Sequence, residues 1–352
     1  MRRRVTLALG LVLGLVACNG NQPTAGHDAG LPDTSATGGQ PAQTGGSKGS
    51  GGATGSGGAA TGGVTGSGGS GTWDASPDIS IGGDGNTAVD VGRDSNGGQG
   101  MDGAQGYCPS GWQLAWSDEF DGAAGATADS GKWVYETGNG SGGWGNAELE
   151  YYRSQNGVLD GNGNLVITAK QETVSGFNYT SSRLKTQGKV TLTYGHIESR
   201  IKLPYGQGVW PAFWLLGNDI GANAWPGCGE IDVMENIGNE PTKVHGTMHG
   251  PGYSGGAGPT ATYTLPGGGK FADDFHVFAI EWEQNVVRWY VDGTLYSTKT
   301  PADIGSGNTW VYDKPFFILL NFAVGGQWPG NPDSTTVFPQ TMTVDYVRVC
   351  QR

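Results

Sequence analysis

The sequence predicts an all-β fold: a two-sheet antiparallel β-sandwich, or jelly roll, with one concave face free to hold a long groove. Short runs of β-branched and aromatic residues recur along residues 107–352, and clusters of Gly, Asn, Pro and Asp that read as turns separate them. Helical periodicity is scarce in the same region. Many short strands joined by turns are typical of a sandwich or jelly roll.

The expected strands begin with QLAWSDEF at 113–120 and end with TVDYVRVC at 343–350, and each of these two lies next to a cysteine. Cys108 and Cys350 bracket the region and could close it with a disulfide in an oxidising compartment, which would leave Cys228 as a single thiol. The sequence alone leaves this pairing open. The other strand-like runs are LVITA at 165–169, HIESRIKL at 196–203, FHVFAIEWE at 275–283, VVRWYVDG at 286–293, FFILLNFAV at 316–324 and TMTVDYVRV at 341–349.

The first eighteen residues, MRRRVTLALGLVLGLVAC, join an arginine-rich start to a short apolar run, which is the pattern of a secretory signal and not of a membrane span. The run ends in LVAC, which resembles a bacterial lipobox. On that resemblance, Cys18 becomes the lipidated N-terminus after cleavage, and Asn19 is compatible with an outer-membrane or surface destination. An ordinary cleaved signal with a chance cysteine is the alternative.

Residues 19–106 contain 28 glycines in 88 positions and one aromatic residue, Trp73. Such a segment cannot bury enough apolar surface to offset the entropy of ordering it, so we expect a flexible tether. Its reach is on the order of 50 Å, from about 5–6 Å times the square root of its length. The predicted parts are therefore a signal peptide at 1–18, a tether at 19–106 and one folded domain at 107–352.

The chain carries a formal net charge of −12, and 34 of its 35 aromatic residues fall in the predicted folded domain. An acidic domain rich in aromatic residues argues against nucleic acid as a partner, because the phosphate backbone would be repelled. A neutral polymer is the better candidate. We expect a monomer that meets the membrane only through its N-terminal lipid anchor.

The segment GEIDVMEN combines strand-forming residues with three acids, Glu230, Asp232 and Glu235. A strand has a side-chain period of two, so the third acid of one face should stand where Met234 is found. A β-bulge around Val233 and Met234 would shift this phase and turn Glu235 onto the face of the other two acids. Three crowded carboxylates repel one another and at least one pKa must rise, which suits acid–base chemistry. Scattered, solvated acids at a strand edge are the alternative.

GEIDVMEN resembles the E-x-D-x-x-E signature of glycoside hydrolase family 16, and the likeness spans essentially all of residues 110–350. The extra residue is similar to the laminarinase, agarase and carrageenase branches, whereas bacterial lichenases typically lack it. GWGN-x-E together with WPAFW is most similar to the endo-β-1,3-glucanases. The flanking motifs are LAWSDEFDG at 114–122, GWGNAELEYY at 143–152, SRIKLPYGQGVWPAFWLLG at 199–217, DDFHVFAIEWEQNVVRWYVDG at 273–293 and LLNFAVGGQWPG at 319–330.

The resemblance implies a retaining endo-glycoside hydrolase that cleaves β-1,3-glucan and needs no cofactor for catalysis. Glu230 would be the nucleophile, Glu235 the acid and then the base, and Asp232 the residue that orients Glu230 and sets the protonation balance. The nearest alternative is another activity of the family, on mixed-linkage glucan, agar or carrageenan, although sulfated substrates would favour a basic groove. A non-catalytic β-glucan-binding lectin is the second alternative, and it would typically lack these acids.

Tryptophan side chains are expected to hold the sugar, because the C–H face of a sugar ring stacks on an indole. Trp282 and Trp289 lie on alternating apolar strands and are expected in the core, whereas Trp210, Trp214 and Trp328 stand beside Pro and Gly in loop-like contexts. The substrate-binding residues implied by the resemblance are Trp144, Asn146, Glu148, Trp210, Trp214, His249 and Trp328.

Two other motifs match the patterns of a zinc site and a nucleotide site but are not interpreted as such. His245 and His249 have the i, i+4 spacing of a helical zinc pair, but they lie in a strand-like, glycine-containing context. On a strand they would share a face, which favours a place for His249 near the sugar. GNGSGG at 138–143 matches GxGxxG formally, but no strand–turn–helix unit surrounds it, so we expect a loop over the cleft.

The resemblance also implies a structural calcium near the paired chain ends. Asp345 in the last strand matches the aspartate of that site, with Glu119 and Gly163 as ligands through their backbone oxygens. The alternative is that Asp345 is an ordinary surface residue. A metal here would be structural and would take no part in catalysis.

Overall fold

The computed structural model describes residues 106–352, and the fold is given for this part of the chain. The predicted signal peptide at 1–18 with Cys18, and the predicted tether at 19–106 except for its last residue, lie outside the described residues. Within residues 106–352, no helix is long and apolar enough to cross a membrane.

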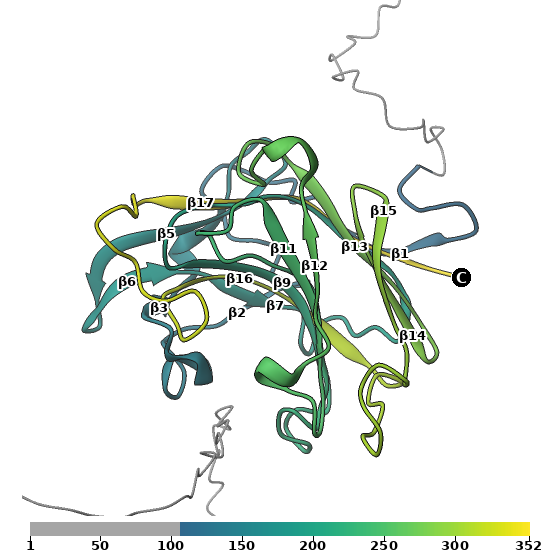
Figure 1. The fold of residues 1–352 in the computed structure, drawn as a ribbon. Coiled ribbons are helices and arrows are strands. Elements are labelled where there is room, and N and C mark those ends of the chain that lie inside the picture. Colours follow the sequence, from purple (N-terminus) through teal and green to yellow (C-terminus); the bar gives the residue numbers. More distant parts are fainter. Residues whose placement is uncertain (1–105) are drawn as a thin grey trace, which may run out of the picture. The chain divides into compact units, whose positions relative to one another are not determined.

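Two β-sheets stack as layers, with β17 and β5 in one and β16, β9 and β7 in the other (Figure 1). Neighbouring strands are antiparallel except for β3 and β6. The ten-stranded sheet has the order β15 (Thr294–Lys299), β14 (Val286–Val291), β13 (His276–Glu283), β8 (Gly195–Lys202), β17 (Gln340–Gln351), β5 (Leu165–Val174), β6 (Phe177–Ser181) and β3 (Glu150–Tyr152), with β1 (Gln113–Asp118) beside β17 and β4 (Gly157–Leu159) beside β5.

The second sheet has seven strands and carries the GEIDVMEN segment near its middle, in β10. Four short helical turns lie in the connections. The order of the strands is β12 (Ala261–Thr264), β11 (Lys243–His249), β10 (Glu230–Glu235), β9 (Val209–Gly217), β16 (Phe316–Val324), β7 (Arg183–Lys185) and β2 (Val134–Tyr135), and the turns are η1 (Gly143–Ala147), η2 (Ser154–Asn156), η3 (Gly255–Ala257) and η4 (Pro266–Gly268).

The predicted all-β sandwich is confirmed, and each strand-like run lies on a strand of the structure. One part of the prediction is wrong: Trp210 and Trp214 lie in β9, a central strand, and not in a loop. Proline is unusual in a central strand because it has no N–H to donate. Pro211 lies in β9 all the same, and its carbonyl oxygen accepts a hydrogen bond from the amide of Asn236 at 3.2 Å.

The hydrophobic core fills the space between the two sheets. In β9, Phe213 and Leu215 are fully buried in this core, while the alternating residues face away from it. Trp282 and Trp289 on the ten-stranded sheet are also fully buried, as predicted. The face of the seven-stranded sheet that is turned away from the core is therefore available for a site.

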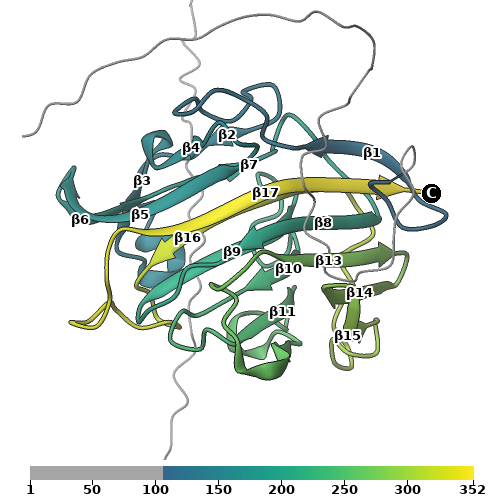
Figure 2. The same ribbon diagram turned by 90° about the horizontal axis from the view of Figure 1, so that it is seen from above.

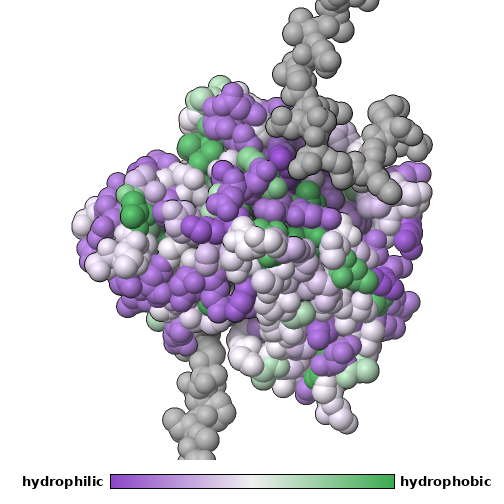
Figure 3. Space-filling model, turned by 45° about the horizontal axis from the view of Figure 1, so that its top comes forward, coloured by the Kyte–Doolittle hydropathy of each residue, from purple (hydrophilic) through white to green (hydrophobic). Residues whose placement is uncertain are grey.

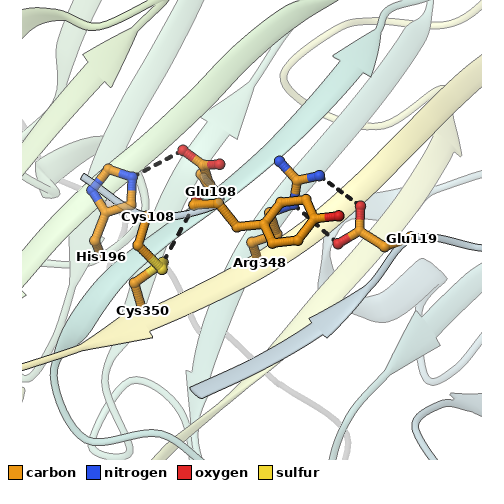
Figure 4. The surroundings of a disulfide bond; sticks show 7 residues. Cys108, Glu119, His196, Glu198, Arg348 and Cys350 are labelled. Carbon is orange, nitrogen blue, oxygen red and sulfur yellow. Dashed lines mark hydrogen bonds and ion pairs between the residues drawn. A yellow bond between two sulfur atoms is a disulfide. The ribbon is translucent and has the colours of Figure 1, made fainter. Parts of the chain in front are cut away.

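The two ends of the described chain meet at β1 and β17, and a disulfide joins Cys108 to Cys350 across 242 residues. A cross-link of this span restricts the unfolded chain and typically contributes about 2–4 kcal/mol. Figure 4 shows charged pairs beside it on the outer face of the ten-stranded sheet: His196 with Glu198 at 2.9 Å, and Arg348 with both carboxylate oxygens of Glu119.

Figure 3 shows hydrophilic residues mixed with residues of intermediate hydropathy and a few hydrophobic spots. In the ten-stranded sheet, β17, β8 and β13 run side by side (Figure 2). Its acids are matched by bases, as for Asp345 with Arg200 at 2.8 Å and Glu283 with Arg288 at 2.8 Å. This face is built as a solvated, charge-balanced surface.

Candidate active site

A β-bulge in β10 places the three acids of GEIDVMEN on one face. Asp232 pairs with Trp214 and Glu235 with Ala212 of β9, so Val233 and Met234 together stand opposite a single residue, Phe213. Both bulged side chains are buried in the core, and the acids face away from it. Val233 and Met234 also interrupt the register with β11, where Asp232 lies opposite Thr247 and Glu235 lies opposite His245. The predicted bulge is confirmed.

Trp289 of the opposite sheet supports the bulge from the core side. A bulge interrupts the hydrogen-bond ladder, and the indole Nε1 of Trp289 donates to the carbonyl oxygen of Asp232 at 2.8 Å. Gly246 of β11 lies beside this contact, where a Cβ atom would stand 2.5 Å from the Trp289 ring. A glycine is therefore required next to the bulge, because the indole occupies the space of a side chain.

Each catalytic candidate contacts a tryptophan or a histidine. The indole of Trp225 donates to Glu230 Oε2 at 3.0 Å, and the indole of Trp210 donates to Glu235 Oε1 at 3.1 Å. His249 Nε2 lies 3.2 Å from Asp232 Oδ2 and 3.8 Å from Glu230 Oε1. The first of these two is a close ion-pair contact whose angles do not make a good hydrogen bond. His249 thus lies among the acids, as its strand position predicted.

The three acids are largely buried, and their protonation is shifted accordingly. Asp232 is 3% exposed although it faces away from the core. Burial, with a smaller contribution from the charge of Asp232, raises the pKa of Glu230 to about 8. Burial also raises the pKa of Asp232 to about 8, and burial together with the charge of Asp232 raises the pKa of Glu235 well above its usual range. The cluster therefore retains protons near neutral pH.

The predicted sugar-binding tryptophans form two groups. In the first, the guanidinium of Arg183 lies 4.3 Å from the ring centre of Trp144 and 5.0 Å from that of Trp214, an arrangement that fixes both indoles by cation–π contacts. In the second, Trp210 and Trp328 meet edge to face at 5.5 Å. Trp328 is 43% exposed and offers the most open aromatic surface of the four.

Asn146 and Glu148 are placed differently from each other. Asn146 is exposed in η1, while Glu148 is buried and accepts hydrogen bonds from Asn146 Nδ2 at 3.0 Å and from the Tyr152 hydroxyl at 2.9 Å. Both carboxylate oxygens of Glu148 are therefore engaged by neighbouring side chains. Asn146 is the member of this pair that reaches the surface.

In the described part of the chain, one group of three metal-ligating side chains is brought together: Glu230, Asp232 and His249 each place one ligand atom within 4.8 Å of the others. His245 is not part of this group and instead lies against Trp328 at 5.1 Å. At the predicted calcium site, the backbone oxygen of Glu119 lies 3.8 Å from where a Cβ of Gly163 would stand. The carboxylate of Asp345 is paired with Arg200.

Two contacts at the site were not expected from the sequence. Trp225, in the loop between β9 and β10, binds Glu230, and its indole lies 6.0 Å from the His249 ring. Arg183 has its own acid partner in Glu136 and stacks between two tryptophans. The WPGCGE segment directly before β10 was the available signal for Trp225, whereas nothing local marked Arg183.

A β-sandwich whose outer face presents buried, partly protonated carboxyls among tryptophans defines a glycoside hydrolase. The chain belongs to Glycosyl hydrolases family 16, whose family model matches residues 146–348. It is 42% identical over 250 residues to the "Beta-glucanase" of Rhodothermus marinus, covering 68% of this chain and 85% of that one. In structure it resembles the endo-beta-1,3-glucanase from Pyrococcus furiosus, with TM-score 0.66 and 53% identity over 68% of this chain and 94% of the other.

The "Clotting factor G alpha subunit" of Tachypleus tridentatus is also similar, at 41% identity over 240 residues. The match covers 68% of this chain but 34% of that relative, so the chain spans about a third of its length. The likeness to this relative concerns the matched part alone.

Proposed function

We propose that the protein is a retaining endo-glycoside hydrolase that cleaves β-1,3-glucan of the laminarin type. The single observation that carries this proposal is the bulge in β10, which places Glu230, Asp232 and Glu235 on one face among tryptophans. The similarity to an endo-beta-1,3-glucanase and to a beta-glucanase supports the substrate class.

In the first step of the proposed reaction, a carboxylate oxygen of Glu230 attacks the anomeric carbon while Glu235 protonates the departing glycosidic oxygen. In the second step, Glu235 removes a proton from water, which attacks the same carbon and releases Glu230. The raised pKa of Glu235 keeps the proton that the first step needs. The Trp225 indole and the charge of His249 favour the ionised form of Glu230 and oppose the effect of burial.

Asp232 lies between the two glutamates and is coupled to both. Its charge is the largest electrostatic contribution, after burial, that raises the pKa of each glutamate. We therefore assign Asp232 the task of orienting Glu230 and setting how protons are distributed in the cluster. Trp144, Trp214, Trp210, Trp328 and Asn146 supply the surfaces and the polar group that hold the sugar chain.

The direct test is to incubate the protein with laminarin, lichenan, agarose and carrageenan and to follow new reducing ends, beside Glu230→Gln and Glu235→Gln. We expect rapid release of short oligosaccharides from laminarin and loss of this activity in both variants. Full activity in Glu230→Gln, or no activity of the unaltered protein on any of the four polymers, would sink the proposal.

Preference for another polymer in the same panel would favour a mixed-linkage, agar or carrageenan activity. Binding of laminarin without cleavage would favour a glucan-binding lectin. All three acids are present and their pKa values are raised, which a protein that only binds sugar would not need.

We propose in addition a structural calcium held by Asp345 and by the backbone oxygens of Glu119 and Gly163. An all-oxygen donor set suits calcium. Since Asp345 is paired with Arg200, calcium would have to compete with that ion pair. A chelator should lower the melting temperature by a few degrees, and Asp345→Asn should abolish the effect; an identical melting curve with and without chelator would contradict a bound calcium.

We also propose that the protein is exported and anchored to the bacterial outer membrane or cell surface through a lipid on Cys18, and that it is a monomer. The lipobox-like LVAC sequence supports the anchor. In cells, the unaltered protein should sediment with membranes. The Cys18→Ser variant should be found in the soluble fraction outside the cytoplasm. The same distribution for both proteins would contradict the lipid anchor. Size-exclusion chromatography of the released protein tests the monomer.

A further inference from the structure

A second pair of acids, Glu148 and Glu150, lies in the same part of the molecule as the three acids of β10 and takes no part in the proposed reaction. Glu150 is fully buried on β3, and Glu148 is 5% exposed just before it. Within the described residues no lysine, arginine or histidine forms an ion pair with either one. Two adjacent buried carboxyls without such a partner are costly unless a proton lies between them.

The hydrogen-bond donors around Glu148 show where that proton lies. Trp214 Nε1 donates to Asn321 Oδ1 at 2.8 Å, so the Asn321 amide nitrogen is the donor in its 3.2 Å contact with the Tyr152 hydroxyl. The Tyr152 hydroxyl must then donate to Glu148 Oε2. The other oxygen of Glu148 accepts from Asn146. Glu148 therefore accepts at both oxygens and is the accepting member of the pair.

Glu150 has the opposite character. Its Oε2 accepts from the backbone amide of Val324 at 2.6 Å, while its Oε1 is buried with no partner among the residues described unless it carries a proton shared with Glu148. Burial, followed by the charge of Glu148, raises the pKa of Glu150 well above its usual range. Glu150 is thus the neutral member, and it donates to Glu148.

The pair connects three parts of the predicted sugar-binding surface. Through Asn146 it holds η1, which carries Trp144, and through Tyr152 and Asn321 it orients the Trp214 indole. Through the Val324 amide it fixes the end of β16, from which the loop with Trp328 departs.

We propose that Glu148 and Glu150 share one buried proton and act as a positioning pair that sets the geometry of the glucan-binding tryptophans. The pair does not touch the reacting atoms, so it acts on substrate binding more than on the chemical step. This inference rests on the proposed glucanase function for its kinetic test, and a second test of stability is independent of that function.

The kinetic test compares Glu148→Gln with Glu150→Gln on laminarin oligosaccharides. In Glu150→Gln the amide group can still donate to Glu148 and its oxygen can still accept from Val324, so we expect KM within about twofold of the unaltered protein. In Glu148→Gln one acceptor becomes a donor that faces another donor, so KM should rise about 5- to 20-fold with kcat changed less than about threefold. Equal damage by both variants, or an unchanged KM in Glu148→Gln, would overturn the proposal.

Tyr152→Phe provides a second route if Glu148→Gln fails to fold. It removes the hydroxyl that connects Glu148 to Asn321, so KM should rise about 3- to 10-fold with kcat nearly unchanged. An unchanged KM would contradict the connection to Trp214. Glu283→Gln on the ten-stranded sheet is the matched control and should leave both constants unchanged.

The stability test uses the melting temperature against pH. The titratable groups that face Glu150 are Glu148 and Tyr152 from its own segment. Arg183 of β7, which is paired with Glu136, acts by its charge on Glu148 and Tyr152, and the β16 groups that contact the pair are uncharged. A carboxyl whose pKa is raised in the folded state contributes less to the stability of the fold as pH rises. The melting temperature of Glu150→Gln should therefore rise relative to that of the unaltered protein with increasing pH. A difference that is constant with pH would refute the shared proton, even if no polymer is cleaved.

Discussion

The two outer faces of the sandwich carry acids in opposite ways. On the ten-stranded sheet, acids stand beside bases at the surface, as in Asp345 with Arg200 and Glu283 with Arg288. On the seven-stranded sheet, Glu230, Asp232 and Glu235 are largely buried, and within residues 106–352 their ion-pair contacts are limited to His249. The first arrangement balances charge, whereas the second concentrates it.

This difference teaches that the pairing of an acid, and not its presence, separates a solvated surface from a working site. An unpaired buried carboxyl costs stability, and a fold keeps it where the raised pKa is used. The pair Glu148 and Glu150 follows the second pattern at one remove, since it shapes the site without entering the reaction.

The largest effect is expected from removing the two reacting carboxyls separately. Glu230→Ala and Glu235→Ala should each lose about 1,000-fold or more in kcat, because one removes the nucleophile and the other the acid. Added azide distinguishes the two roles. In Glu230→Ala, azide should attack the anomeric carbon in place of the missing carboxylate and give an α-glycosyl azide. In Glu235→Ala, azide should attack the glycosyl-enzyme and give a β-glycosyl azide. Product stereochemistry by NMR is the measurement, and the reverse assignment would exchange the two roles.

The next effect concerns the support of the bulge from the core. Gly246→Ala places a methyl group against the buried indole of Trp289, so it should destabilise the fold by about 1–3 kcal/mol and lower kcat by displacing Glu235. Gly256→Ala is the matched control, because nothing lies within 4 Å of its added Cβ. Denaturant unfolding measures both. Equal stability of the two variants would show that the indole does not limit the space beside the bulge.

The sequence allowed prediction of the fold and the acid face because both follow from local periodicity. The two-residue period of GEIDVMEN, broken at Met234, was enough to infer the bulge and the common face of the three acids. Contacts between distant segments could not be read in this way. Trp225 belongs to a loop whose path depends on tertiary packing, and Arg183 contacts tryptophans 39 and 31 positions away in sequence, at Trp144 and Trp214.

The expectation of a loop around Trp210 and Trp214 was wrong for a related reason. Pro211 favours a loop locally, and only the pairing with β10 and β16 makes this segment the central strand β9. Likewise, Glu148 and Glu150 are two positions apart and share one face of the chain. Whether that face is buried depends on its packing against β16 and β7. Side-chain pattern gave the periodicity of these segments, and the partners decided their environment.

A smaller effect is expected when the middle acid loses its charge. Because the Asp232 charge raises the pKa of Glu230, Asp232→Asn should move the acidic limb of the kcat/KM profile to lower pH, with kcat reduced about 10- to 100-fold. Asp232 has a raised pKa, so its stabilising contribution is present below about 4 and is lost as pH rises through about 8. Asp232→Asn should therefore gain in melting temperature over the unaltered protein across that range. An unshifted limb would contradict the coupling.

The smallest effect is expected on the opposite face, where charges are paired. Glu283 and Arg288 are each about a third exposed and lie 2.8 Å apart, so a double-mutant cycle with Glu283→Gln and Arg288→Gln should give a favourable coupling of about 0.2–0.5 kcal/mol. The same cycle with Glu230→Gln and Asp232→Asn near pH 8 should give a coupling of the opposite sign, because either change alone already relieves the repulsion. Couplings of the same sign in both cycles would mean that Glu230 and Asp232 stabilise each other as Glu283 and Arg288 do. The contrast between the two sheets would then be wrong.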